Sequence, residues 1–137
     1  MSMSNFSRKF SIDLDKFLIK TKKGYSAKLR KATINGFRSA IMSTRVNTGH
    51  ARINWKVSLG DVNTNTVGKP KTTPKRGTTP NTDEFKMSGV EGVAVTLKRG
   101  LIDNIYISNN LDYIGYLNWL DDYESNIVKS VENALAS

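Results

Sequence analysis

The feature that most constrains the fold is a change of hydrophobic period at Asn47-Thr-Gly49. Before it, apolar and small residues recur every three or four positions from Leu14 to Ala40, which predicts an amphipathic helix. After it, apolar and polar residues alternate from Ala51 to Leu59, which predicts a strand with one buried face. Glycine tolerates the positive φ that turns a chain out of a helix. The sequence therefore predicts an α+β fold with a helix joined directly to a strand.

The first helix is expected to begin at Ser11, whose hydroxyl can cap free backbone N–H groups, and to end near Arg45. Gly24 can divide it into a short and a long part, because an interior glycine costs up to about 1 kcal/mol. Residues 1–10 are rich in serine, asparagine and arginine and are expected to form a mobile N-terminal arm, although Phe6 and Phe10 could dock onto the body.

Residues 60–82 contain all three prolines, many threonines and four Lys/Arg, which predicts a long flexible loop too polar to join a core. Residues 82–97 then favour a helix, although Val93–Leu97 also fits a strand. Farther on we expect a strand at 103–108, a turn at Asn109-Asn110, a short helix at 111–120 and a terminal helix at 124–136. The prediction is one domain over residues 1–137, with a long N-terminal helix packed on a small, mostly antiparallel β-sheet, followed by a C-terminal helix.

Charge is unevenly distributed along the 137 residues, whose net charge is +9. Residues 1–56 hold 13 Lys/Arg against two Asp, whereas residues 101–137 hold one lysine against six acids. A basic front can neutralise phosphate. Opposite charge at the two ends can also steer copies of one protein together, or the lysines can simply solvate a helix. No motif for sequence-specific nucleic-acid binding accompanies the charge.

Catalytic and cofactor chemistry have little support in the sequence. His50 is the only histidine, and it follows a Thr-Gly turn with no local carboxylate to orient it as a general base. Cysteine is absent, which excludes disulfides and thiolate metal sites. Asp121-Asp122 and Glu124 form an acidic cluster without the pattern of a calcium loop. We therefore expect no enzyme activity, no cofactor and no metal. The absence of a signal-like or membrane-spanning apolar run makes folding in a reducing cytoplasm the expectation.

Aromatic residues gather in the last third of the chain. They surround the short helix expected at 111–120 and comprise Tyr106, Tyr113, Tyr116, Trp119 and Tyr123. One interpretation is a core layer. The other is a partly exposed patch at a subunit interface, where tyrosine and tryptophan supply large, rigid contact area.

Two segments resemble the signature segments of the tail-completion, or neck, proteins of long-tailed bacteriophages. The first is Val46-Asn-Thr-Gly-His-Ala-Arg-Ile-Asn-Trp55, similar to the family pattern Val-Asp-Thr-Gly-Arg-x-Arg-x-x-Trp. The second, Ile105-Tyr-Ile-Ser-Asn-Asn-Leu-Asp-Tyr-Ile114, is similar to Ile-Tyr-Ile-Thr-Asn-Asn-Leu-Pro-Tyr-Ala. Element order and spacing also agree from about residue 11 to residue 120. Departures are Asn47, His50 and Asp112, and a Gln-Ala-Pro segment is missing.

This resemblance implies a head–tail joining or tail-terminator-like virion protein that forms a ring, usually hexameric, at the top of the tail. Its partners would be its own copies, the head-side connector or stopper proteins, the tail tube protein and double-stranded DNA in the lumen, with no membrane. It would reside in the virion, and in the host cytoplasm during assembly. The motif residues with an expected structural role are Thr48, Gly49, Arg52, Trp55, Asn109, Asn110 and Tyr113.

Assembly leads to two further expectations. The acidic, aromatic end would contact the basic helix of the next copy, through Tyr113, Tyr116, Trp119, Asp121, Asp122, Tyr123 and Glu124. The residues expected to face DNA or an acidic neighbour are Lys20, Lys22, Lys23, Lys28, Arg30 and Lys31. The alternative function is a small basic nucleic-acid-binding module that uses this lysine-rich helix.

Overall fold

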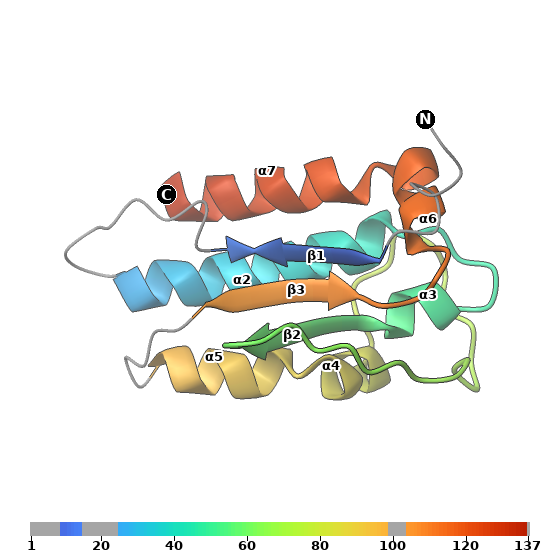
Figure 1. The fold of residues 1–137 in the computed structure, drawn as a ribbon, viewed down its shortest axis with the longest axis horizontal. Coiled ribbons are helices and arrows are strands. Elements are labelled where there is room, and N and C mark those ends of the chain that lie inside the picture. The colour runs from blue at the N-terminus through green and yellow to red at the C-terminus, as the bar shows by residue number, and fades with distance from the viewer. Residues whose placement is uncertain (1–8, 15–24, 99–103, 137) are drawn as a thin grey trace.

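The computed structural model describes residues 9–14, 25–98 and 104–136, and its architecture is α+β. The described strands form one antiparallel sheet in the order β1-β3-β2, so that the last strand in sequence lies in the middle (Figure 1). Their bounds are Phe10–Asp13 for β1, Trp55–Leu59 for β2 and Ile105–Asn109 for β3. A small antiparallel sheet behind a long helix is the fold class that the sequence predicted.

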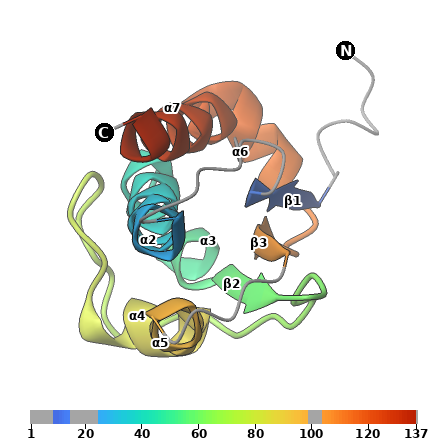
Figure 2. The same cartoon turned by 90° about the vertical axis from the view of Figure 1, so that its left-hand side faces the viewer.

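Helices cover one face of the sheet, with α2 at the centre, α7 on one side and α5 on the other (Figure 2). The helices α2 and α7 lie side by side and run in opposite directions (Figure 1). The helical bounds are Tyr25–Ser43 (α2), His50–Ile53 (α3), Thr82–Ser88 (α4), Val90–Lys98 (α5), Ile114–Asp121 (α6) and Tyr123–Ala136 (α7).

The core lies between the sheet and α2. In the sheet register Ile107 stands opposite both Ile12 and Val57, so one face of all three strands is apolar. The backbone of α2 approaches this face at Gly36, where an added Cβ would lie 2.9 Å from Ile107 Cδ1 and 3.0 Å from Val131 Cγ2. Glycine is therefore required there by close packing of α2 against β3 and α7.

Several sequence expectations are confirmed and others are wrong. Residues 82–98 are helical, as preferred, in two pieces separated by Gly89 at φ 84°. The helix start at Ser11 is wrong, because Ser11 lies in β1, whose Phe10 and Ile12 face the core while Ser11 does not. The strand expected from Ala51 starts at Trp55 instead, after the one-turn helix α3. The expected course of the first helix through Gly24 lies outside the described residues.

Candidate functional site

The two segments that carry the family resemblance meet at one end of the sheet. Asn109, the last residue of β3, stands opposite Trp55 in the register. Its side-chain amide donates to the carbonyl oxygen of Ala51 at 3.0 Å, and its Oδ1 accepts from the backbone N–H of Leu111 at 3.2 Å. Next to it, the amide of Asn110 donates to the carbonyl of Asn63 at 3.0 Å. The buried asparagine pair thus ties the end of β3 to α3 and to the loop after β2.

The turn between α2 and α3 depends on Gly49. Its φ is 83°, in the left-handed region, and a Cβ there would lie 2.8 Å from Pro70 Cγ and 3.0 Å from Pro74 Cδ. Thr48 Oγ1 accepts weakly from the backbone N–H of His50 at 3.4 Å. Two prolines of the long loop therefore pack directly against the turn, and a side chain at position 49 would displace them.

The region where residues 46–55 and 105–114 meet is called the joint below. Arg52 makes the most hydrogen bonds of any side chain in it, and it is 0% exposed. Its Nε and Nη2 donate to the two carboxylate oxygens of Glu84 at 2.9 and 2.8 Å. The remaining N–H groups reach the carbonyl of Lys75 (3.0 Å), Thr78 Oγ1 (3.1 Å) and the carbonyl of Thr79 (3.3 Å). All five guanidinium N–H groups have an acceptor, which is the condition for burying this charge.

Trp55 anchors an aromatic cluster in the core. Its ring meets those of Phe10 and Tyr123 edge to face, with centroids 5.6 and 5.0 Å away, and its Nε1 donates to Thr44 Oγ1 at 2.9 Å. Phe10, which the sequence assigned to a mobile arm, is therefore part of the sheet. Tyr123 is 1% exposed and donates to the carbonyl of Ile114 at 2.8 Å. Its expected place at a subunit interface is wrong, because its ring fills the core of the protomer.

Asp121 lies in a second ion-pair cluster. Its side chain is 0% exposed, and its Oδ1 lies 2.7 Å from Arg45 Nε and 3.2 Å from Arg76 Nη2. Its Oδ2 also accepts from the backbone N–H of Arg45 at 2.9 Å. The expectation that Asp121 meets the next copy is therefore wrong as stated, because its carboxylate is buried and pairs with Arg45 and Arg76 of the same chain.

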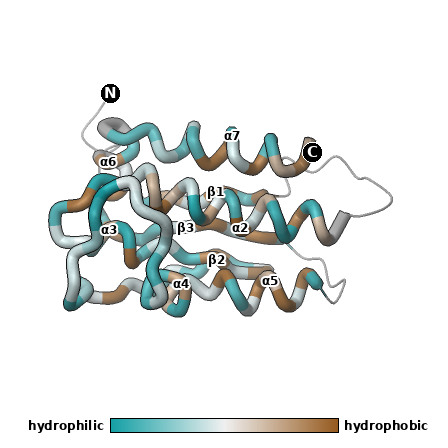
Figure 3. The backbone as a smooth tube through the Cα atoms, turned by 180° about the vertical axis from the view of Figure 1, so that it is seen from behind, coloured by the Kyte–Doolittle hydropathy of each residue, from teal (hydrophilic) through white to brown (hydrophobic). Residues whose placement is uncertain are grey.

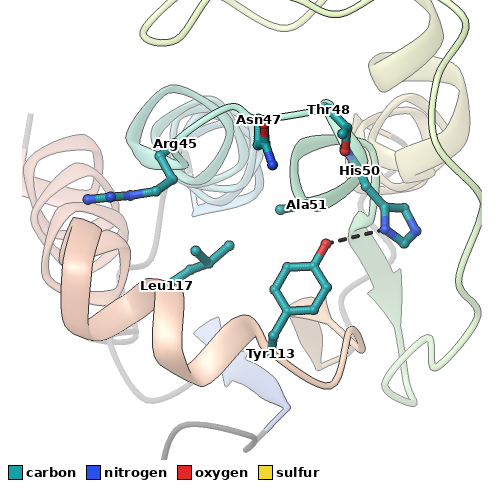
Figure 4. Close-up of a pocket in the computed structure, with 8 residues that line it drawn as sticks. Arg45, Asn47, Thr48, His50, Ala51, Tyr113 and Leu117 are labelled. Carbon is teal, nitrogen blue, oxygen red and sulfur yellow. Dashed lines mark hydrogen bonds between the residues drawn. The ribbon is translucent and has the colours of Figure 1, made fainter.

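A cavity of about 440 Å³ opens where the two segments meet, lined by Arg45, Asn47, Thr48, Gly49, His50, Ala51, Tyr113 and Leu117 (Figure 4). Across it the hydroxyl of Tyr113 lies 3.2 Å from His50 Nδ1, and His50 Nε2 lies 2.9 Å from the carbonyl of Val67. A carbonyl only accepts, so Nε2 carries the proton in this arrangement and Nδ1 accepts from the hydroxyl. Burial raises the pKa of the Tyr113 hydroxyl above its ordinary value. The pair positions a turn, and no carboxylate completes a relay with it among the described residues.

The other predicted contact residues divide into three groups. Asp122 and Glu124 are exposed at the start of α7, and Tyr113 is 42% exposed, so these three remain available to a neighbour. The side chains of Tyr116 and Trp119, and all of Lys20, Lys22 and Lys23, lie outside the described residues. On α2, Lys31 is exposed while Lys28 and Arg30 are half-buried.

The long loop between β2 and α4, mostly hydrophilic in Figure 3, lies against the body at successive points. Asn54 holds its first half, because its side chain accepts from Val67 N–H at 2.7 Å and donates to Val67 carbonyl at 2.9 Å. Arg52 and Asp121 hold its second half through Lys75–Thr79 and Arg76. The prediction that residues 60–82 are flexible stays a prediction. For this loop to move away from the body, these hydrogen bonds would have to break.

Sequence reasoning missed four residues of this site: Asn54, Arg45, Arg76 and Glu84. One of them had a local signal. Asn81-Thr-Asp-Glu84 reads as a capping box, and the structure contains it, with Asn81 as N-cap of α4. The contacts of the others with the long loop and with Asp121 join residues 13 to 76 positions apart, for which the sequence offers no spacing rule.

Comparison of this chain with protein-family models, with curated proteins and with solved structures finds no match. Within the described ranges no group of three or more His, Cys, Asp or Glu could hold a metal ion. In the same ranges, no helix has the length and apolar character needed to cross a membrane.

Proposed function

We propose that this protein is a structural component of a bacteriophage neck, which forms a ring at the head–tail junction, completes the tail and joins it to the head connector around the DNA. The observation that supports the proposal is the convergence of its two family-like segments. Residues 46–55 and 105–114 lie far apart in sequence, yet Asn109 bonds Ala51 and Tyr113 bonds His50. Two short resemblances that build one joint are stronger support than two scattered ones.

The chemistry of the joint agrees with a structural role. Its polar side chains are bonded to backbone groups or to one another, as Arg52 is to Glu84 and Asn109 to Ala51. A site that performs acid–base or nucleophilic chemistry needs a reactive group held near its base. In the joint, the hydrogen-bond donors and acceptors instead bond to one another and hold α3, β2, β3 and the long loop in fixed positions relative to each other.

Particle assembly tests the proposal. A nonsense codon in this gene, in the phage genome that carries it, should leave filled heads and finished tails that fail to join. Supplying the wild-type protein from a plasmid should restore joined particles, and gold-labelled antibody should mark the neck in electron micrographs. Joined, infectious particles that lack the protein would contradict the proposal.

The alternative function, a nucleic-acid-binding module, can be distinguished from the neck protein by measuring the affinity of the monomer for DNA. Non-specific contacts give dissociation constants of about 10⁻⁴ to 10⁻⁶ M at physiological salt. A verified monomer of a neck protein should bind unrelated duplexes no more tightly than this. Nanomolar binding by the monomer would favour the alternative.

A further inference from the structure

The surface between α2 and α7 contains a groove that differs from the cavity at the joint. It is open, has a volume of about 590 Å³, and is lined by Asn35, Arg38, Ser39, Met42, Ser43, Arg76, Asp121, Asn126, Ser130 and Asn133. Met42 is the single apolar side chain in that lining. The residues that dominate protein interfaces are enriched in tryptophan, tyrosine and arginine and lie in fully desolvated pockets. This groove is open, and its lining contains no aromatic side chain.

The charge of the groove is positive. Asp121 is its one acid, and that carboxylate already accepts from Arg45 and Arg76. Arg38 is exposed, and no hydrogen bond or ion pair is recorded for it within the described part of the chain. Arg76 keeps 55% of its side chain exposed beside Asp121. The two arginines therefore present guanidinium groups to whatever enters the groove.

Positive charge continues from the groove along the same face of α2. Lys28, Lys31, Asn35 and Arg38 follow each other at steps of three and four, which places them in one row on the helix. At 1.5 Å per residue the row from Lys28 to Arg38 is roughly 15 Å long. Phosphates on one strand of B-DNA rise 3.4 Å each along the helix axis, so a row of this length laid along the axis covers the rise of about four of them. A linear array suits a polyanion better than a small anion, which needs one point of charge.

The facing side of α7 supplies neutral side chains that can donate hydrogen bonds to phosphate oxygens. Asn126, Ser130 and Asn133 form a row at steps of four and three, and the exposed Lys129 lies next to it. Serine and asparagine side chains, with arginine and lysine, are the groups that most often contact DNA phosphates without reading bases. The exposed acids of α7, Glu124 and Glu132, are not among the groove lining.

We infer that the α2–α7 groove binds the phosphate backbone of double-stranded DNA without sequence preference. Arg38 and Arg76 make the charged contacts, and Asn126, Ser130 and Asn133 make neutral ones. The inference extends the proposed function, which places DNA beside this protein, by naming the surface that meets it. It overlaps the sequence expectation at Lys28 and Lys31, and it moves the main contacts to Arg38, Arg76 and the polar side chains of α7.

The test is fluorescence anisotropy with a labelled random-sequence 24-base-pair duplex, measured over a series of salt concentrations. Arg38→Gln should weaken binding about tenfold and make the slope of log K against log[salt] shallower by about 0.9, the value for one lost phosphate contact. Lys98→Gln is the matched control, because it removes one exposed positive charge at the end of α5, on the opposite side of the molecule from α7 (Figure 1). It should change affinity less than twofold.

A second pair of variants changes the groove without removing a cation. Asn133→Asp adds a negative charge to the lining and should weaken binding several-fold, whereas Asn65→Asp makes the same change on the exposed long loop and should have little effect. Circular dichroism should show all four variants folded. Equal losses in groove and control variants, or competition by polyglutamate as strong as by unlabelled DNA, would overturn the inference. Such a failure would leave head–tail joining untouched, because particle assembly tests that function separately.

Discussion

Two arginine–carboxylate clusters attach the same loop to the body of the protein, and they differ in burial. In the Arg52–Glu84 cluster, the two side chains are 0% and 2% exposed, and every guanidinium N–H is bonded. In the Arg45–Asp121–Arg76 cluster, the carboxylate is buried, whereas the arginine side chains are 42% and 55% exposed. The first cluster fixes the geometry of the joint, and the second leaves charge accessible to solvent and to ligands.

Burial decides how each cluster responds to change. A buried ion pair adds little stability compared with an apolar pair, but removing one partner leaves an uncompensated charge and is costly. An exposed pair is screened by salt and contributes about 1 kcal/mol or less. The Arg52–Glu84 cluster should therefore tolerate salt but not substitution. The second cluster, in which only the arginines are exposed, should respond more to salt and less to substitution.

Glu84→Gln should have the largest effect, because the amide keeps the shape of the side chain but leaves the Arg52 charge unpaired. We expect a loss of about 3–5 kcal/mol in the free energy of unfolding, measured by urea denaturation. Glu91→Gln, at an exposed acid in the first turn of α5, is the control and should stay within about 0.5 kcal/mol. If the Glu84→Gln protein were as stable as wild type, the Arg52–Glu84 pair would not be what stabilises the joint.

Trp55→Ala tests the apolar side of the same joint. The indole is 0% exposed and packs on Phe10 and Tyr123, so its loss should cost about 3–5 kcal/mol. The comparison sharpens if the loop is probed as well. Trypsin should cut at Lys71 or Lys75 faster in Glu84→Gln than in Trp55→Ala at matched stability, because only the first variant releases contacts of the loop itself. Equal cleavage rates would mean that the loop follows global stability.

The sequence predicted what depends on local pattern. The glycine turn at Gly49, the strand expected at 103–108 and the helix expected at 124–136 follow from period and turn chemistry. The structure contains the turn, and it contains the other two as β3 (Ile105–Asn109) and α7 (Tyr123–Ala136). It failed where a partner far along the chain decides. Phe10 and Ile12 alternate with polar residues as a strand should, but whether a four-residue segment forms a strand depends on β3, almost a hundred residues later. Likewise the alternation begun at Ala51 lost to α3, which Asn54 stabilises by donating to the carbonyl of His50 at 2.8 Å.

The candidate site was predictable in its residues and not in its contacts. Arg52 and Trp55 could be singled out in the sequence, whereas Glu84 and the carbonyls of Lys75 and Thr79 could not be matched to Arg52 from spacing. The charge argument failed for the same reason. Net charge per segment cannot show that Asp121 is already paired with Arg45 inside the protomer.

Asp121→Asn should have a smaller effect than either core change, about 1 kcal/mol, because both arginines can turn to water. The prediction is clearest in its salt dependence. Raising sodium chloride from 0.05 to 0.5 M should reduce wild-type stability more than that of the variant, as measured by urea denaturation. Asp122→Asn is a close control, since Asp122 is exposed and asparagine tolerates its positive φ of 53°. The same salt response in both variants would mean that the second cluster contributes nothing measurable.

Lys56 provides the smallest and most specific test, because it is a buried cation that forms no ion pair within the described residues. The residue is 3% exposed, and its Nζ donates to the carbonyl of Met87 near the end of α4 at 2.7 Å.

Burial lowers the pKa of Lys56 below its ordinary 10.5. Below the folded-state pKa the amine is charged in both states, and the folded state bears the full desolvation cost. As pH rises from the folded pKa toward 10.5, the folded protein loses this proton before the unfolded chain does, so the cost is relieved and stability increases. Lys56→Met should abolish that increase, whereas the exposed Lys86→Met should retain it in urea denaturation between pH 7 and pH 10.5. Parallel curves for Lys56→Met and Lys86→Met would mean that burial does not lower the pKa of Lys56, because its hydrogen bond to the carbonyl of Met87 offsets the desolvation cost.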